Sequence, residues 1–521
     1  MEDIVEKGNN EIERYMSIYK QVRTKYKDEN KLAVFYQIGD FYEIYSLVNS
    51  DDGSKEGNGW ELAGDLNLVM GKKNAKVYNN PKIIPYIIGI PLVSLDKYLT
   101  MAVSDYGWTI VLYVQADTPT GRKKRVFDSI ISPGTNTNTT SETNNMMVLY
   151  MEKVKSLRHK GSEVFFVGVA FLDTLTGEVG TIQYPFKEQL NEAVIYDEII
   201  KLITIKNPKD ILIYTKKCNM SEKQIVDTLH LNYYNHKIYL DCLPLDFTKL
   251  EYQTNLFENI YKTSSIEDES SKLHIFETLN IKNYPYTIIS LTILMEYIIK
   301  RNQSLIYRIN KPYLMFNSSS NLILQNNSLE QLNIVNNQKR NFHFEKRLSL
   351  LTLLDKTKSI IGKREFRNKL MNPITDTKVL NERYNNIDIF NTIDFEKQGD
   401  IRDILGSIID IKRATRHIIN KTMRYNDISP LFESIKACMS LYDNLKVVYK
   451  YDSKANSLLP KLENNTKLIK LKDYFETTFN MDYLRGVVFK NNDINETIFN
   501  ESVSEELNNI QLDINTNKTI I

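Results

Sequence analysis

The sequence predicts two small α/β domains followed by a mainly helical domain. The chain has 521 residues, and a single hydrophobic core seldom serves a chain of this length, so several domains are expected. In the first half, apolar runs typical of strands alternate with helical spacing, which favours sheets covered by helices. From about residue 285 the apolar spacing becomes helical, apart from short strands expected near residues 313–325 and 484–489.

The composition excludes several classes of protein. Hydrophobic residues make up 42% and charged residues 25% of the chain, as in a soluble globular protein. The net charge of +2 argues against a uniformly basic nucleic-acid coat, but it permits a basic cleft. The three cysteines and six histidines lack the spacing of metal ligands, so no metal site is expected. Without a signal peptide or an apolar run of ~20 residues, an intracellular protein with no membrane partner is expected.

Residues 1–135 are expected to form the first α/β domain. Its apolar segment at residues 32–38 is rich in β-formers and predicts a buried strand. Asp40 is then expected to cap a helix, because Glu43 follows three residues later as in a capping box. The other elements expected here are a helix at residues 5–27, strands at 83–90 and 109–114, and a helix at about 94–104 between those strands.

The second and third domains are separated by polar stretches. Residues 136–145 are polar and of low complexity, and they predict a linker. Residues 146–265 are expected to form the second α/β domain, and residues 273–521 the helical one. In the second domain, strands are expected at residues 163–173, 178–184 and 210–214, and a helix at about residues 188–205. In the third, an apolar helix is expected at residues 286–302, and further helices with apolar residues at helical spacing at 346–371, 376–393 and 401–423.

Four separated segments resemble the MutS family of DNA mismatch repair proteins, in that family's own order. They are Phe35 to Tyr45 with the pentapeptide Gly39-Asp40-Phe41-Tyr42-Glu43, Ile88 to Leu99 running on to Gln115 and Ser132-Pro133-Gly134-Thr135, Gly168 to Glu178, and Ser349 to Arg383. The resemblance implies that residues 1–135 are a mismatch-binding domain and residues 146–265 a connector. It also implies that residues 273–521 are a core and lever region ending at the start of a clamp.

The resemblance implies specific roles for Phe41 and Glu43. Phe41 would enter the minor groove and stack on a base at the mismatch, and Glu43 would hydrogen-bond that base. An apolar wedge must unstack and kink the duplex, which costs less at a mispaired step. The alternative is structural: Phe41 would be a core residue and Glu43 only a cap. Tyr42 is expected to pack in the core.

Basic residues in the first domain are candidate contacts to DNA phosphates, because each neutralised phosphate releases counterions. The alternative for each is a solvated charged surface. The candidates are Lys20, Arg23, Lys25, Lys27, Lys72, Lys73, Arg122, Lys123, Lys124 and Arg125. In the helical region, Gly362-Lys363-Arg364 is expected to be structural rather than a phosphate cradle. Lys412, Arg413 and Arg416 are expected to lie on an exposed helix face.

The sequence lacks the P-loop of the family's C-terminal ATPase. The chain is therefore expected to be non-catalytic, with no cofactor of its own, and ATP and Mg²⁺ would belong to the missing domain. The expected ligand is double-stranded DNA with mismatches or small loops, bound by a homodimer or heterodimer. The expected location is the cytoplasm or nucleus, or a viral replication site if the chain is from a large DNA virus. The alternative is an interaction or regulatory subunit that pairs with a separately encoded clamp and ATPase polypeptide.

Overall fold

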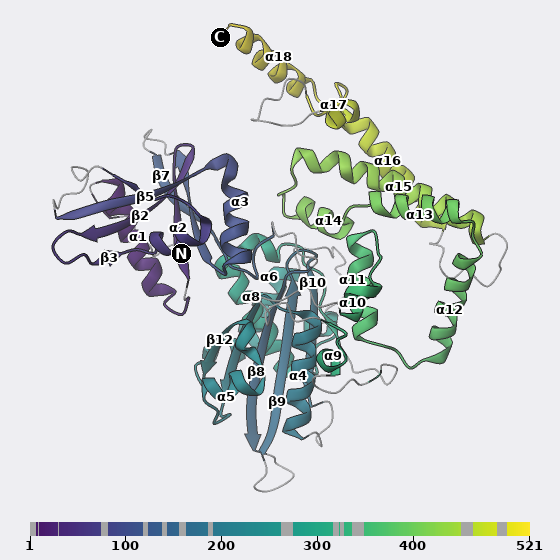
Figure 1. Cartoon of the computed structure of the whole chain (residues 1–521), viewed down its shortest axis with the longest axis horizontal. Helices are drawn as coiled ribbons and strands as arrows, with labels where there is room; N and C mark the ends of the chain where they lie inside the picture. Colours follow the sequence, from purple (N-terminus) through teal and green to yellow (C-terminus); the bar gives the residue numbers. More distant parts are fainter. Residues whose placement is uncertain are drawn as a thin grey trace. The chain divides into compact units, whose positions relative to one another are not determined.

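The computed structural model forms two compact units, residues 1–316 and 317–521. It describes residues 7–8, 10–29, 31–73, 82–117, 123–137, 143–155, 163–185, 191–261, 275–315, 322, 328–335, 349–449, 462–486 and 497–520. The first unit contains two β-sheets with helices packed on them, and the second is built of helices (Figure 1). The predicted fold class, α/β followed by mainly α, is confirmed.

The first sheet has the strand order β4-β5-β2-β1-β6-β7, and β3 pairs with β2. Its strands are β1 (Leu32–Ile38), β2 (Phe41–Asn49), β3 (Lys55–Glu56), β4 (Gly71–Lys72), β5 (Ile83–Pro91), β6 (Thr109–Asp117) and β7 (Lys123–Ile131). Its helices are α1 (Glu11–Lys25), α2 (Gly59–Leu66) and α3 (Leu95–Thr100), the last flanked by the short turns η2 (Leu92–Ser94) and η3 (Met101–Asp105). The strands expected at residues 83–90 and 109–114 are confirmed.

Helix α1 covers one face of this sheet because it carries a buried apolar stripe. Tyr15 lies edge-on to Tyr36 and Tyr45, with ring centroids 5.9 and 5.2 Å away. The hydroxyl of Tyr15 donates to the carbonyl of Val34. All four side chains are fully buried, so this aromatic contact fixes α1 across β1 and β2.

The helix expected after Asp40 is wrong, because the chain forms a β-hairpin instead. Strands β1 and β2 are antiparallel, with Ile38 opposite Phe41, so Gly39-Asp40 is a two-residue turn. Gly39 has a φ of +58°, which suits the first central position of a type II′ turn. Residues 41–49 then pair with β5 along their whole length. Glu43 is therefore a strand residue and caps no helix.

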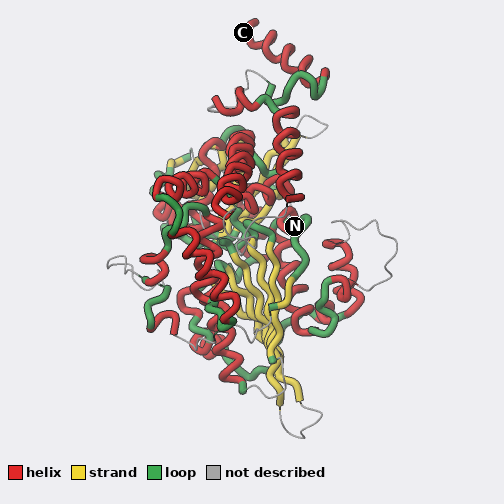
Figure 2. The backbone as a smooth tube through the Cα atoms, turned by 90° about the vertical axis from the view of Figure 1, so that its right-hand side faces the viewer, coloured by secondary structure: helices red, strands yellow, loops and turns green. Residues whose placement is uncertain are grey.

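The second sheet has the strand order β12-β11-β8-β9-β10-β13. Its strands are β8 (Asn145–Lys155), β9 (Glu163–Asp173), β10 (Glu178–Tyr184), β11 (Asp210–Lys216), β12 (Asn235–Leu240) and β13 (Tyr313–Leu314). Its helices are α4 (Glu192–Lys206), α5 (Glu222–Thr228), α6 (Leu250–Tyr261), α7 (Ile275–Thr278) and α8 (Pro285–Arg301), with the short turns η4 (Leu231–Tyr233), η5 (Leu245–Thr248) and η7 (Gln303–Ile306). Figure 2 shows its long strands running side by side.

Helices cover both faces of the second sheet, which explains its continuous apolar strands. Alternate residues of β8 enter two separate cores: Met146 and Val148 pack with α6 to α8, and Met147 and Leu149 pack with α4 and α5. Helix α8 approaches β9 so closely that a Cβ on Gly168 would lie 2.0 Å from the carbonyl oxygen of Tyr286. Only glycine fits there.

The packing of α8 places the start of the helical unit later than the sequence predicts. The sequence predicts the helical domain from residue 273, but α7 and α8 are buried against the second sheet, and the units divide after residue 316. Helical periodicity identifies α8 correctly. It does not reveal that the buried stripe faces a sheet rather than other helices.

Two buried carboxylates join the first sheet to the second. Asp210, at the start of β11, accepts hydrogen bonds from the Ser132 hydroxyl (2.7 Å) and the Gly134 amide (2.9 Å). Glu29, in the loop between α1 and β1, accepts from Lys237 of β12 and Arg301 of α8. Both carboxylates are at most 5% exposed, so they have exchanged water for these fixed partners.

The predicted polar linker, residues 136–145, is described in part. Asn145 is the first residue of β8, and Asn136 and Asn144 are buried. The Asn144 side-chain amide donates to the carbonyls of Gly134 and Asn136, at 3.0 and 2.9 Å. The polar residues at both ends of this segment are therefore part of the fold, because their amides satisfy buried backbone carbonyls.

The second unit is built of helices, and its small buried core comes from residues between 414 and 498. The helices are α9 (Ser328–Gln331), α10 (Leu350–Leu354), α11 (Ile360–Met371), α12 (Thr377–Asn391), α13 (Phe395–Ser407), α14 (Ile411–Ile419), α15 (Tyr425–Tyr449), α16 (Leu462–Thr478), α17 (Met481–Gly486) and α18 (Glu505–Ile520). Ser359 caps α11 and Asp410 caps α14, so the helices predicted at 346–371 and 401–423 are each divided.

The two short strands predicted in this part of the chain have different outcomes. Strand β13 confirms the one near residue 313. The strand predicted near residue 484 is wrong, because residues 484–486 lie in α17, and residues 487–489 lie outside the described residues. In the described part of the chain, every helix is too short or too polar to be a membrane span.

We expect the Glu29→Gln variant to lower the stability of the first unit and to flatten its dependence on acid pH. Burial opposes the charge on Glu29, but Arg301 and Lys237 outweigh it and lower its pKa to about 2. Because the folded pKa is below the unfolded one, this stabilisation is fully present above about pH 4.5 and is lost as the pH falls through about 2. The loss at pH 7 should be roughly 3 kcal/mol, since two buried cations lose their counter-ion.

Urea unfolding between pH 7 and pH 2 measures this effect. The two tryptophans, Trp60 and Trp108, lie in the first α/β domain, so their fluorescence reports on the region that Glu29 joins. The matched control is Glu56→Gln, which removes an exposed ion pair with Lys20 and should cost less than about 1 kcal/mol. Equal effects of the two substitutions would contradict the prediction.

Candidate nucleic-acid interface

The tip of the β1–β2 hairpin is held from both sides. On the β6 side, the Gly39 amide donates to the side chain of Gln115 (3.2 Å), and the Gln115 amide donates to the side chain of Gln37 (2.9 Å). On the β5 side, the amide of Leu92 donates to the carbonyl of Asp40 (2.8 Å). The residues that follow the turn therefore have a defined position although the turn is exposed.

Strand alternation places the two candidates, Phe41 and Glu43, on the face of β2 opposite Tyr42. Phe41, Glu43 and Tyr45 lie on one face of β2, and Tyr42 and Ile44 lie on the other. Tyr42 is 3% exposed in the first core, as predicted. Burial and the nearby Asp128 raise the pKa of Tyr42 to about 12, so its hydroxyl stays protonated at neutral pH.

Phe41 is an exposed aromatic residue at a strand end. It is 46% exposed, unlike the core residue of the alternative interpretation. Its partners on β5 are small or short: Pro91 lies opposite, and a Cβ on Gly89 would be 3.6 Å from the Phe41 ring. Leu92 and Val93, which follow β5, are also exposed. A surface of this kind presents an apolar group to a ligand without disturbing the core.

Glu43 is held within a group of polar side chains. Its Oε2 atom accepts hydrogen bonds from the Tyr45 hydroxyl and from Lys73 Nζ, the latter at 3.2 Å. Lys73 Nζ also donates to the Tyr45 hydroxyl (2.9 Å). The Glu43 side chain is 16% exposed, so it remains accessible. The structure thus places Glu43 and Phe41 on the same face and gives Glu43 two partners.

The predicted phosphate contacts do not form one patch. Lys72 is on β4 and Lys123 and Lys124 are on β7, and these strands are the two opposite edges of the sheet. All three lysines are exposed. Lys73 is partly buried and bonded to Glu43. Arg122 lies outside the described residues.

The basic residues of α1 lie away from the hairpin tip. Arg23 donates to the carbonyl of Glu29 (2.6 Å), next to the start of β1. Lys20 pairs with Glu56 (3.0 Å), which lies opposite Leu47, six residues beyond Phe41. At about 3.3 Å per residue, this pairing is roughly 20 Å from the tip. Lys25 and Lys27 are exposed beyond Arg23.

Arg125 is placed inside the domain rather than on its surface. Its side chain is 7% exposed, its Nε donates to the carbonyl of Gln37 (3.1 Å), and it pairs with Glu11 at 3.3 Å. The guanidinium also lies over the ring of Tyr36. Arg125 therefore supports the hairpin and the first turn of α1. A basic run in the sequence does not distinguish this residue from its exposed neighbours.

The basic residues of the helical unit have structural surroundings. Arg364 forms a bidentate pair with Asp410, with one contact at 2.7 Å, which agrees with the structural interpretation of Gly362-Lys363-Arg364. The expectation that Arg416 is exposed is wrong, because it is 4% exposed. Burial lowers its pKa to about 10.

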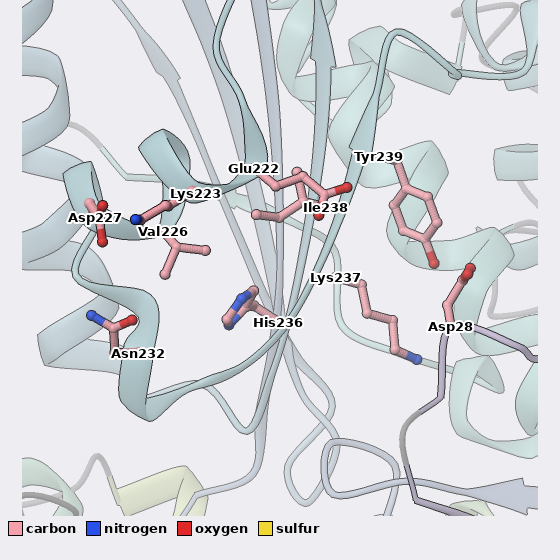
Figure 3. A pocket seen from close by; sticks show the side chains of 10 residues that line it. All are labelled: Asp28, Glu222, Lys223, Val226, Asp227, Asn232, His236, Lys237, Ile238 and Tyr239. Atoms are coloured by element: carbon pink, nitrogen blue, oxygen red, sulfur yellow. The ribbon is translucent and has the colours of Figure 1, made fainter.

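A hollow of about 540 Å³ lies beside the edge strand β12 (Figure 3). Its charged lining has both signs: Asp28, Glu222 and Asp227 are acidic, and Lys223 and Lys237 are basic. Figure 3 shows His236 between the residues of α5 and Lys237. Within the described residues there is no cluster of metal-ligating side chains. The mixed charge does not define a ligand.

Tyr45 and Lys73 contact Glu43, and the sequence does not reveal these contacts. It predicts Lys73 as a phosphate contact and assigns no role to Tyr45. The signal that would have found Tyr45 is the alternation of a strand, because residues 41, 43 and 45 share a face. Interpreting the segment as a helix removed that signal. Lys73 is 30 residues from Glu43 in the chain, so only the fold brings them together.

Together, the fold and this site define a protein with an exposed apolar group and a held carboxylate at a sheet end, followed by a second α/β domain and a helical unit. Comparison with protein-family models identifies two of these regions. Residues 13–141 match MutS domain I, and residues 327–512 match MutS domain III. The chain therefore belongs to the MutS family. The second sheet lies between the matched regions, and its assignment as the connector stays a prediction.

Similar proteins include a mutS homolog of Acanthamoeba polyphaga mimivirus, described as a DNA mismatch repair protein. It is 25% identical over 538 residues, which cover 98% of this chain and 45% of the relative. The DNA mismatch repair protein MutS of Clostridium kluyveri is 25% identical over 88% of this chain and 46% of its own length. That of Persephonella marina is 26% identical over 82% of this chain and 42% of its own. The chain thus spans less than half the length of these relatives.

We expect Gly39→Ala to destabilise the first domain by about 1 kcal/mol, because an L-residue at a φ of +58° is strained. No heavy atom lies within 4 Å of the added Cβ, so the effect would come from the backbone alone. Urea unfolding followed by tryptophan fluorescence measures it.

The matched control is Gly64→Ala in α2, where a Cβ also meets no atom within 4 Å. This substitution should stabilise the domain by about 0.5–1 kcal/mol, because alanine is the better helix former. Changes of the same sign in both variants would argue against a strained turn at Gly39.

Proposed function

We propose that this chain recognises mismatched or looped double-stranded DNA and acts in DNA mismatch repair. The observation that carries the proposal is the exposed Phe41 at the end of a sheet, on the same face as Glu43. The membership in the MutS family and the names of the similar proteins support the same process.

The proposed mechanism uses the deformability of DNA. Phe41 enters the minor groove and stacks on a base, which unstacks a base step and kinks the duplex at a cost of a few kcal/mol. A mispaired step costs less to unstack and bend than a paired one, so the wedge selects mismatches without reading sequence. Glu43 then accepts a hydrogen bond from the displaced base.

The scaffold suits this mechanism because Phe41 would lose little conformational entropy when it enters the duplex. Its strand is paired on both sides, with β1 and β5, so the backbone is already ordered before DNA binds. An ordered wedge avoids the entropy cost of fixing a flexible loop. The chain is proposed to work as a dimer around the duplex and to be non-catalytic, with ATP turnover on other residues.

We expect Phe41→Ala to lower the affinity for a G·T-mismatched duplex by at least about tenfold, or about 1.4 kcal/mol. Weak, salt-dependent binding to a fully paired duplex should persist, because it comes from phosphate contacts. Fluorescence anisotropy with both duplexes measures the two affinities.

The matched control is Tyr106→Ala, an aromatic residue of the same domain that is 41% exposed. It should leave the ratio of the two affinities unchanged. If Phe41→Ala also leaves that ratio unchanged, Phe41 is not the wedge. If the parent chain shows no preference for the mismatch, the proposed function fails.

A second candidate function is supported by the helical unit. Helix α12 is 15 residues long and has no buried residue. Tyr384 and Ile387, which are three residues apart on one side of this helix, are 57% and 56% exposed, and Phe395 at the start of α13 is 83% exposed. Such apolar side chains favour a protein partner. We propose as the alternative an interaction subunit that pairs with a separate polypeptide carrying the clamp and ATPase.

For this alternative we expect the chain to co-sediment with a polypeptide that carries clamp-like helices and a P-loop, encoded beside its gene. Tyr384→Asp and Ile387→Asp should each weaken the complex at least about tenfold, because they bury a charge in an apolar interface. Asn385→Asp, an exposed polar position of the same helix, is the control. Absence of such a reading frame, or sedimentation of the chain alone, would speak against the alternative.

A further inference from the structure

The polar group around Glu43 is asymmetric. Both contacts, from the Tyr45 hydroxyl and Lys73 Nζ, fall on Oε2. Within the described residues, Oε1 accepts no hydrogen bond. A carboxylate has about four acceptor positions, so this arrangement fixes one oxygen and leaves the other available.

The two partners of Glu43 are themselves fixed. Tyr45 is fully buried and packs edge-on against Tyr15, with ring centroids 5.2 Å apart. The backbone amide of Lys73 donates to the carbonyl of Pro85 on β5 (2.9 Å), and its ammonium lies 4.9 Å from the Tyr45 ring centroid. The hydroxyl of Tyr45 accepts from Lys73 and donates to Glu43. A held carboxylate of this kind loses little rotamer entropy on meeting a ligand.

We propose that Tyr45 and Lys73 are positioning residues that hold Glu43 ready for a DNA base, with Oε1 as the acceptor. The inference rests on the proposed function of Phe41 and Glu43. Burial, and then the hydrogen bond to Glu43, raise the pKa of Tyr45 far above its ordinary value, which keeps the hydroxyl a donor at neutral pH.

Lys73 has a second consequence for binding. An unpaired carboxylate at a DNA surface is repelled by the phosphates, whereas a carboxylate beside an ammonium is locally neutral. Lys73 therefore lets Glu43 approach the duplex. This role differs from the phosphate contact predicted from the sequence, because it acts through Glu43 and affects the mismatched duplex most.

Tyr45→Phe and Lys73→Gln are the variants that test the inference. Tyr45→Phe keeps the buried ring and removes only the hydroxyl, so the domain should fold. Each variant should lower the preference for a G·T-mismatched over a paired duplex by about threefold or more, measured by fluorescence anisotropy. The G·T mismatch is the probe because both of its bases carry a ring N–H that a carboxylate accepts from. Lys73→Arg should retain the preference, since it keeps a charged donor.

Lys72→Gln is the matched control, because Lys72 is the exposed neighbour on β4. As a phosphate contact it would weaken binding to both duplexes equally and leave the preference unchanged. The salt dependence provides a second readout: a lost phosphate contact lowers the slope of log K against log salt by about one for both duplexes. If Lys73→Gln lowers this slope for both duplexes and leaves the preference for the mismatch intact, Lys73 is a phosphate contact and the inference is overturned.

A double-mutant cycle separates positioning from an independent contact. In a Glu43→Gln background, Tyr45→Phe and Lys73→Gln should cause no further loss of preference. The same loss in both backgrounds overturns the inference. If Phe41→Ala abolishes the preference but Tyr45→Phe and Lys73→Gln leave it unchanged, the proposed function stands and the positioning role fails. If the parent chain has no preference, both fail together.

Discussion

The structure of the first unit depends on charges buried where its two sheets meet. Glu29 comes from the loop before β1, and its partners Lys237 and Arg301 come from the second sheet and its covering helix. The other Glu29 oxygen accepts from Thr109 at the start of β6. Removing one member of a buried ion pair costs more than the pair contributes, because the remaining charge is left without water or counter-ion. The two sheets therefore separate only at a high cost in free energy.

The buried charges around Glu29 and the β1–β2 hairpin turn lie at opposite ends of strand β1. Glu29 is near the start of β1, and the turn at Gly39 follows its end. Between them, the aromatic contact of α1 and the pairing of β2 with β5 make the sheet continuous. A force on Phe41 is therefore transmitted through paired backbone rather than through a loop. Rigid support of this kind is what a wedge needs, since a flexible tip would bend before the duplex did.

The sequence predicted the fold class, which the structure confirms. It named Phe41 and Glu43 as candidate site residues but did not predict their geometry. The pentapeptide at residues 39–43 contains a capping-box pattern, which is a local signal. Pairing with β5, more than 40 residues later, decides that it becomes a strand. The same limit explains Arg125, which looks like its exposed neighbours until the fold buries it against Gln37 and Glu11. Burial and partners depend on residues distant in the chain, and local patterns carry no information about them.

The distribution of charge bears on how the proposed wedge would provide selectivity in this domain. The lysines of β4 and β7 lie on opposite edges of the sheet, the cations of α1 lie toward its far end, and Lys73 is engaged by Glu43. Of these residues, Lys123 and Lys124 lie nearest the hairpin tip, because they pair with the end of β6 just beyond Gln115, which bonds Gly39. Sequence-independent attraction to paired DNA should therefore come from few cations there. Weak binding to paired DNA improves discrimination between mismatched and paired duplexes. The free energy gained only at a deformable base step is then a larger share of the total binding free energy. The apolar ring of Phe41 and the neutralised carboxylate of Glu43 both fit that requirement.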